Sequence, residues 1–226
     1  MELSIIIPAL NEAAGIAETI ARTRRLGACE IIVVDGGSLD GTLEFCASAD
    51  LCLRSPRGRA VQQNRGAAAS RSGVLLFLHA DCWLEPGAFE AMRQALADER
   101  CVGGCFRQRI DADGIAYRLL ETGNEWRARL LGWAYGDQGL FVRRSVFEQV
   151  GGFPEVELME DLYFMKRLKR MEGGRFRVVD HRLHVSPRRW QQCGLLRQTL
   201  RNWAFIVLAH CGVPPRVLAK RYADVR

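Results

Sequence analysis

Polar residues that could carry chemistry follow several apolar runs of the sequence. Asp35 comes directly after the apolar run 31–34, and no helix follows closely enough for it to cap, which favours a ligand contact. Asp81 ends the run that starts at Val74, and His79 lies on the same strand face. A carboxylate delivered by a buried strand can hold Mg²⁺ or Mn²⁺ beside a diphosphate, although an ordinary strand-end turn would look similar.

Two further groups lie in the second half of the chain. Glu160 and Asp161 open an amphipathic segment, where the helix dipole favours acids in any case, so a structural and a catalytic role are equally open. Arg188-Arg189-Trp190 offers two guanidiniums that suit a diphosphate and an indole that can stack on a sugar ring. Solvated arginines at a helix start after Pro187 are the alternative.

The elements that would position these residues alternate between short apolar strands and helices. We expect strands at 3–7, 31–34, 51–53, 74–78 and 176–185, and helices at 12–26, 60–70 and between the second and third strands. Strands that are apolar on both faces and alternate with helices predict an α/β fold with a mostly parallel sheet covered on both sides. Ligands of such sheets bind at the carboxyl ends of the strands, which predicts a shared site for residues 8–12, 35–40 and 79–81.

Neither of the common phosphate-binding loops follows the first strand. A dinucleotide-binding sheet would carry Gly-x-Gly-x-x-Gly there, whereas this chain has Pro8-Ala9-Leu10-Asn11-Glu12. A Walker lysine is missing as well. A nucleotide bound to this sheet would therefore be held in another way.

Composition and charge exclude some classes of protein and indicate which partners the chain could bind. The 226 residues are 48% hydrophobic and 26% charged, which excludes a disordered chain. The net charge of +6 is uneven, because residues 163–226 carry 15 Lys and Arg against 3 Asp and Glu. Such a basic part can face phosphate or a membrane surface, or can simply be solvated. We expect no nucleic-acid partner, since an aromatic-interleaved basic surface is missing.

Cysteine spacing and the length of apolar runs indicate the cellular compartment of the protein. The eight cysteines include no Cys-x-x-Cys pair, and Cys29, Cys46 and Cys52 lie among apolar residues as core hydrophobes do. The N-terminus lacks the charged and apolar regions of a signal peptide. The longest apolar run, 203–213, is too short to span a bilayer. We expect a cytoplasmic protein, with peripheral binding at the inner face of the membrane as an option.

Five motifs, in order and at the right spacing, resemble those of the family 2 glycosyltransferases, which have the GT-A fold. The motifs are Ser4-Ile5-Ile6-Ile7-Pro8-Ala9-Leu10-Asn11-Glu12, Val33-Val34-Asp35-Gly36-Gly37-Ser38-x-Asp40-Gly41-Thr42, Gly58-Arg59 with Asn64-Arg65-Gly66, His79-Ala80-Asp81, and Gly151-Gly152-Phe153 followed by Glu160-Asp161. The resemblance covers nearly the whole chain. Gly136-Asp137-Gln138-Gly139 and Ser186-x-Arg188-Arg189-Trp190 are most similar to a small bacterial branch named for arsenosugar biosynthesis, although motifs do not fix an acceptor.

The resemblance implies an inverting glycosyltransferase of the hexosyltransferase type, which moves a sugar from a nucleotide-diphosphate sugar to an acceptor hydroxyl. Asp161 would be the general base, and Asp81 would hold Mg²⁺ or Mn²⁺, with His184 as a further candidate ligand. The implied donor-binding residues are Pro8, Ala9, Asn11, Glu12, Asp35, Gly58, Arg59, Asn64, His79, Ala80 and Asp81. Those on the acceptor or diphosphate side are Gly136, Asp137, Gln138, Glu160, Arg188, Arg189 and Trp190.

One departure from the family pattern keeps alternatives open. His79 stands where the family has the first Asp of its Asp-x-Asp motif. A neutral imidazole can still ligate Mn²⁺ or contact a phosphate. The change nevertheless allows a nucleotide-sugar-binding protein that has lost catalysis. A nucleotidyltransferase can share this kind of sheet, but the Gly-rich loop with a lysine expected after its first strand is missing.

The resemblance places a catalytic domain at 1–190, with a donor half at about 1–110 and an acceptor half at about 111–190. Residues 191–226 would be a helical, basic extension with an apolar stripe that includes Leu196, Leu200 and Trp203. A basic amphipathic helix can lie on an anionic membrane, pack on the catalytic domain, or join two subunits as a homodimer. Packing on protein is the favoured expectation.

Overall fold

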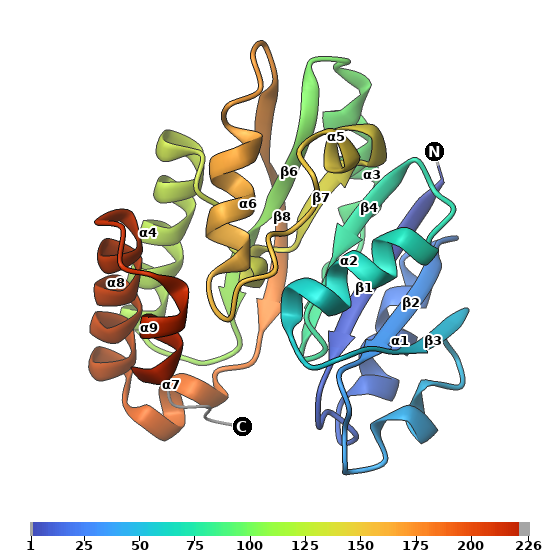
Figure 1. The fold of residues 1–226 in the computed structure, drawn as a ribbon, viewed down its shortest axis with the longest axis horizontal. Coiled ribbons are helices and arrows are strands. Elements are labelled where there is room, and N and C mark those ends of the chain that lie inside the picture. Colours follow the sequence, from blue (N-terminus) through green and yellow to red (C-terminus); the bar gives the residue numbers. More distant parts are fainter. Residues whose placement is uncertain (1, 222–226) are drawn as a thin grey trace.

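The computed structural model describes residues 2–221, and within them eight strands form one sheet (Figure 1). The order across the sheet is β3-β2-β1-β4-β7-β6-β8-β5. The strands are β1 (Leu3–Ala9), β2 (Glu30–Asp35), β3 (Leu51–Arg54), β4 (Val74–Phe77), β5 (Cys82–Leu84), β6 (Cys101–Ile110), β7 (Leu140–Arg143) and β8 (Arg175–Val185).

The first four strands run parallel to one another. β1 pairs with β2 and β4, and β2 pairs with β3. In the second half the sheet is mixed: β7 runs antiparallel to β4 and β6, β8 is parallel to β6, and β5 is antiparallel to β8. Because β1, β2 and β4 are parallel, the segments that follow them reach the same edge of the sheet.

Helices cover both faces of the sheet, as the two-sided apolar strands predicted. They are α1 (Ile16–Arg25), η1 (Thr42–Cys46), α2 (Arg59–Ala69), α3 (Ala88–Ala97), α4 (Ile115–Leu131), η2 (Gly136–Gln138), α5 (Arg144–Gln149), α6 (Glu160–Leu168), α7 (Arg188–Cys193), α8 (Leu195–His210) and α9 (Pro215–Arg221). α1 begins later than expected, at Ile16, and the helix expected between β2 and β3 is the short 3₁₀ turn η1.

β1, β2 and β4 contribute alternate residues to two separate cores. Ile5 and Ile7 pack with α1 and α3 on one face, whereas Ile6 packs with α2, α5 and α6 on the other. α2 can approach β1 closely because Gly66 has no side chain, since a Cβ there would lie 2.5 Å from Cγ2 of Ile6. The glycine of the Asn64-Arg65-Gly66 motif therefore has a packing role.

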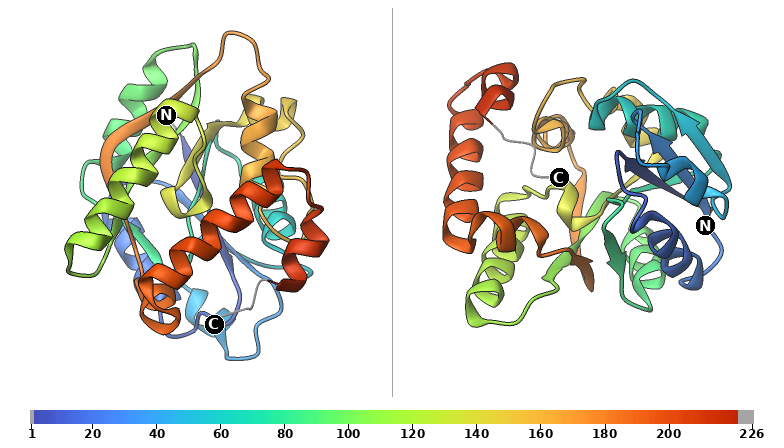
Figure 2. Two further views of the ribbon diagram at one scale, coloured as in Figure 1. Left: turned by 90° about the vertical axis from the view of Figure 1, so that its left-hand side faces the viewer. Right: turned by 90° about the horizontal axis from the view of Figure 1, so that it is seen from below.

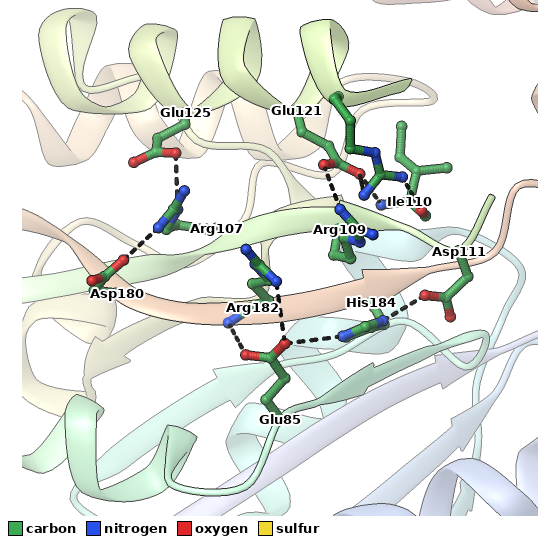
Figure 3. A network of polar contacts seen from close by, with 11 residues as sticks. Glu85, Arg107, Arg109, Ile110, Asp111, Glu121, Glu125, Asp180, Arg182 and His184 are labelled. Atoms are coloured by element: carbon green, nitrogen blue, oxygen red, sulfur yellow. Dashed lines mark hydrogen bonds and ion pairs between the residues drawn. The ribbon is translucent and has the colours of Figure 1, made fainter. Parts of the chain in front are cut away.

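Ion pairs tie α4 to the two long strands β6 and β8 (Figure 3). Arg107 of β6 lies between Glu125 of α4, at 2.8 Å, and Asp180 of β8, at 2.6 Å. Further along β6, Arg109 contacts Glu121 of α4 at 3.5 Å. These contacts hold α4 over the second half of the sheet, where it forms one wall of the site described below.

The C-terminal helices pack on the rest of the fold through α6. Leu162 of α6 forms a small core with Phe205 and Ala209 of α8 and Leu218 of α9. In Figures 1 and 2 these helices, drawn in orange to red, lie beside α4 and α6. No described helix is long and apolar enough to cross a membrane. Residues 222–226 of the expected extension lie outside the described residues.

The eight cysteines, all within the described residues, are free thiols. Cys46, Cys82, Cys101 and Cys105 are buried, and burial raises the pKa of the Cys46 thiol to about 12. Cys52 differs from its expected place in the core: it is exposed, because β3 is the edge strand and its residues alternate between a half-buried and an exposed face.

Candidate functional site

Two adjoining cavities open at the edge where β1 and β4 end. The first, here called the strand-end cavity, measures about 250 Å³ and lies between these strand ends, α2 and α7. The second, the helix-side cavity, measures about 170 Å³ and lies among α4, η2, α6 and α8. Arg59, His79, Leu158 and Arg189 line both cavities, so the two spaces meet at these residues.

Most residues expected to bind a donor line the strand-end cavity. They are Pro8, Ala9, Glu12, Gly58, Arg59, His79, Ala80 and Asp81, together with Glu160, Arg188 and Arg189 from the expected acceptor or diphosphate group. Arg188 reaches toward two acids, with its guanidinium 3.8 Å from Glu12 and 3.9 Å from Asp81. Arg57 and Gln62 also line this cavity and were not singled out from the sequence. Several guanidiniums at one cavity favour an anionic ligand such as a diphosphate.

A candidate cation site lies at the end of β4. His79, Asp81 and Cys82 bring one potential ligand atom each to within 4.8 Å of one another. Burial holds the pKa of the Cys82 thiol well above its usual value, so this group stays protonated and is a poor ligand. The Asp81 carboxylate and the His79 imidazole remain, and Mg²⁺ typically takes few protein ligands and completes its shell with water and substrate phosphates.

Asp35 and Asn11 hold the loops beside the strand-end cavity and do not line it. Asp35 is 1% exposed, and its carboxylate accepts hydrogen bonds from the backbone N–H groups of Gly37 and Ser38, both at 3.1 Å. Asn11 takes a left-handed conformation, with φ +54°, and accepts a hydrogen bond from the N–H of Leu39 at 3.0 Å. Asp35 has no helix to cap, but the N–H groups of its own turn bind its carboxylate, so the expected direct ligand contact is replaced by a structural role.

Asn64 and His184 also lie outside both cavities. The Asn64 side chain donates to the carbonyl of Phe153 at 2.8 Å and accepts from its N–H at 2.9 Å. The two ring nitrogens of His184 contact Asp111 at 2.5 Å and Glu85 at 3.3 Å (Figure 3). Because its nitrogens are engaged there, His184 does not join Asp81 as a metal ligand in this structure.

Asp161 lies in the first turn of α6 and lines the helix-side cavity. Its carboxylate accepts hydrogen bonds from the N–H of Gly136 at 2.8 Å and of Leu162 at 2.7 Å. Burial raises the pKa of Asp161 to about 6, the neighbouring Glu160 carboxylate adds to the rise, and the two N–H groups and Arg59 oppose it. A carboxylate with a pKa near neutrality can accept a proton at physiological pH.

Glu160 connects α6 to α2. It is 3% exposed and its carboxylate pairs with Arg59 at 3.1 Å, across 101 residues of sequence. Met159, which precedes it, takes the left-handed conformation with φ +65°. A non-glycine residue in this conformation is uncommon, and such strain is often found at functional sites.

The turn η2 lies against His79 and Asp161. A Cβ on Gly136 would lie 2.6 Å from Nε2 of His79 and 3.7 Å from Oδ2 of Asp161, so only a glycine allows this approach. Asp137 lines the helix-side cavity, whereas Gln138 is fully buried and accepts a hydrogen bond from Arg127 at 3.0 Å. Gln138 therefore supports the turn and does not line either cavity.

Several residues of the helix-side cavity were not found from the sequence. Trp190 was expected there, but Tyr135, Thr199 and Trp203 were not. Tyr135 Oη, Asp137 Oδ1 and Thr199 Oγ1 make no hydrogen bond within residues 2–221, and such atoms are normally satisfied by water or ligand. The position of Tyr135 next to the Gly136-Asp137 motif was a usable signal. No sequence signal pointed to Thr199, because the pattern of its helix indicates only an apolar stripe.

Comparison with known proteins settles the family. The family model described as Glycosyl transferase family 2 matches residues 4–151. The chain belongs to glycosyl transferase family 2. The matched residues include the β1 and β4 ends and Gly136, while α6 and the C-terminal helices lie beyond the match. The family expected from the sequence is thus confirmed, and the bacterial arsenosugar-type branch stays a prediction.

A sequence relative and several solved structures are similar to this chain. Glycosyltransferase AglE of Haloferax volcanii is 30% identical over 172 residues, which make up 67% of this chain and 56% of that protein. S. aureus TarS 1–349 has a TM-score of 0.65 at 16% identity, over 85% of this chain and 63% of that one. Glucosyl-3-phosphoglycerate synthase of Mycobacterium tuberculosis has a TM-score of 0.64 at 18% identity, over 94% and 81%. The predicted GT-A fold is confirmed, and the chain spans little more than half the length of AglE.

Proposed function

We propose that this family 2 chain is an inverting glycosyltransferase that moves a sugar from a nucleotide-diphosphate sugar to an acceptor hydroxyl. The observation that carries the proposal is the position of Asp161, whose carboxylate lines a cavity that meets the strand-end cavity at His79 and Arg59. The strand-end cavity would take the donor and the helix-side cavity the acceptor. The sugar to be transferred would then lie where the two cavities join.

The donor would be held by groups of both signs. Pro8 and Ala9 end β1, Glu12 follows it, and the three would contact the base and ribose. Arg59, Arg188 and Arg189 line the same cavity and would bind the diphosphate, because guanidiniums form charge-assisted hydrogen bonds with phosphate oxygens. The donor-binding roles of Asp35 and Asn11 become indirect in this proposal, through the loops that they hold.

A divalent cation is part of the proposal. The M. tuberculosis synthase was crystallised with Mn²⁺ and uridine diphosphate, which supports a metal in a chain of the same fold. The residues present fit such an ion, since the Asp81 carboxylate and the His79 imidazole approach each other at the cavity wall. Bound Mg²⁺ or Mn²⁺ would supply positive charge beside the diphosphate leaving group.

The transfer itself would be one in-line displacement. The acceptor oxygen forms a bond to the anomeric carbon while the bond from that carbon to the diphosphate oxygen breaks. The electron pair leaves with the nucleoside diphosphate, and the hydroxyl proton passes to the Asp161 carboxylate. A single displacement inverts the anomeric configuration. General-base help of this kind contributes roughly 10²–10⁴-fold.

The proposal extends to the transferred sugar, the cellular location and the oligomeric state. We propose a hexose as the transferred sugar and a cytoplasmic location at the inner face of a membrane, with contact through the basic C-terminal helices. A homodimer formed through the same helices is the competing arrangement.

Thermal melting with a panel of nucleoside diphosphates, with and without Mn²⁺, tests the donor site. A ligand at 100 times its dissociation constant adds about 2.7 kcal/mol to the free energy of unfolding. We expect a shift with one diphosphate, a loss of its Mn²⁺ dependence in Asp81→Asn, and an unchanged shift in Asp161→Asn. No shift with any diphosphate would contradict the proposal. A shift without sugar transfer would favour a binding protein that has lost catalysis.

A further inference from the structure

Two apolar stripes lie exposed on neighbouring helices. Ile115, Trp126 and Leu130 share one face of α4, and Leu196, Leu200 and Val207 share one face of α8, as their helical spacing requires. These six side chains are 55–80% exposed. We call them the α4–α8 surface. Figure 2, left, shows both helices on the same side of the molecule. Apolar patches of this kind mark sites of interaction.

An apolar groove runs between the two helices and meets the helix-side cavity. The groove measures about 290 Å³, and its walls include Trp126 and Leu130 from α4 and Trp203 from α8. Arg127, Trp203 and Ile206 line both the groove and the helix-side cavity. A ligand in the helix-side cavity can therefore extend into the groove and toward the exposed α4–α8 surface.

The polarity of this combined space changes from its inner to its outer end. Asp161 lies at the inner end, with the unpartnered oxygens of Tyr135, Asp137 and Thr199 in the same cavity. The groove at the outer end is walled almost entirely by aromatic and aliphatic side chains. A polar head with an apolar chain would satisfy both ends, whereas a small polar acceptor would leave the groove exposed to water.

The charge of the C-terminal helices favours an anionic membrane as the partner. Residues 190–221 contain five Lys and Arg and no Asp or Glu, besides Arg188 and Arg189, which line the strand-end cavity. Exposed basic side chains near a lipid surface are attracted by anionic headgroups, while apolar side chains of the same helix enter the acyl boundary. A second copy of this chain would instead bring the same positive charge against itself.

We propose that the acceptor is a membrane lipid, whose hydroxyl-bearing head enters the helix-side cavity while its hydrocarbon chain lies in the groove and the α4–α8 surface rests on an anionic bilayer. This inference rests on the proposed function. The chemical step is the displacement given above, in which the lipid hydroxyl oxygen bonds to the anomeric carbon, its proton passes to Asp161 and the nucleoside diphosphate leaves.

Sedimentation with vesicles tests the surface without any need for activity. The wild type should sediment with phosphatidylglycerol–phosphatidylcholine vesicles more strongly than with phosphatidylcholine alone, and less as salt is added. The double variant Leu130→Glu, Leu200→Glu should bind at least about tenfold more weakly, because two apolar side chains no longer enter the bilayer. Phe45→Glu is the matched control, since Phe45 is also exposed but lies in η1, away from both cavities. It should bind like the wild type.

Transfer into lipid tests the acceptor. With labelled nucleotide sugar and vesicles of total bacterial polar lipids, we expect label in the organic phase, none with Asp161→Asn, and a tenfold or greater loss with the double variant. Label that stays in the aqueous phase would overturn the lipid acceptor. Equal sedimentation of the wild type and the double variant would contradict membrane binding through the α4–α8 surface. So would a wild-type protein that is a dimer in solution while the double variant is a monomer. Absence of a diphosphate melting shift in the wild type would instead overturn the proposed function.

Discussion

The backbone N–H of Gly136 donates a 2.8 Å hydrogen bond to Oδ2 of Asp161, across 25 residues of sequence. The same glycine faces His79, whose Nε2 would lie only 2.6 Å from a Cβ at this position. One backbone unit of η2 thus touches both the end of β4 and the start of α6. It sets the distance between the proposed base and the proposed donor site.

Adding a methyl group at Gly136 should therefore disturb the reaction geometry. In Gly136→Ala the new Cβ displaces the His79 ring, and we expect a fall in kcat/KM of about 10–10²-fold, since displacements of about 1 Å can cost that much. Steady-state sugar transfer measures the effect. Gly73→Ala is the control, because no atom lies within 4 Å of a Cβ there. Equal loss in both variants would point to a general effect on folding.

The pH dependence of transfer should report the titration of Asp161. Its pKa of about 6 predicts a kcat/KM that falls tenfold per pH unit below about 6 and levels off above it, because the protonated carboxyl cannot act as a base. Glu160→Gln removes a charge that raises this pKa, so the acid limb should move to lower pH. The exposed Glu172→Gln should leave it in place. An acid limb that is identical in all three proteins would contradict the assignment.

The same pKa predicts that Asp161 costs stability at neutral pH. A rise from the usual 3.8 to about 6 means that the folded state binds the proton more tightly, so stability is lost as the pH rises from about 4 through 6. Asp161→Asn should raise the free energy of unfolding by about 1–3 kcal/mol at pH 8 and have almost no effect at pH 4. Denaturant titrations at the two pH values measure this. An equal gain at both would show that charge is not the cause.

Asn64 should matter for stability more than for donor binding. Its amide donates to the carbonyl of Phe153 and accepts from the N–H of that residue, so Asn64→Asp places a carboxylate oxygen opposite the carbonyl. We expect a loss of about 1–3 kcal/mol in the free energy of unfolding, with the diphosphate melting shift retained. Arg65→Gln, at the exposed neighbouring position, is the control. Weakened diphosphate binding at unchanged stability would instead support a direct contact between Asn64 and the donor.

The residues that follow strands were the part of the site that the sequence could predict. Pro8 lies at the end of β1, and Glu12, His79 and Asp81 come after strands of continuous apolar residues, and parallel strands end at one edge. Asp35 follows the same rule, yet its carboxylate turns back to its own turn. Which way a strand-end side chain points depends on hydrogen bonds within two or three residues, and an apolar pattern does not contain that information.

The local patterns of the sequence thus determined the α/β fold, its two covered faces and the edge that carries the site, because hydrophobic periodicity and the alternation of strands with helices along the chain depend on neighbouring residues. Tertiary structure alone decided the helix-side cavity. Its walls are set by Phe205 and Leu218 packing on Leu162 and by the pairing of Glu160 with Arg59, which are contacts between distant segments. That packing places Thr199 in the same cavity as the proposed base, since the free energy of burying an apolar side chain does not depend on where its partner lies in the chain.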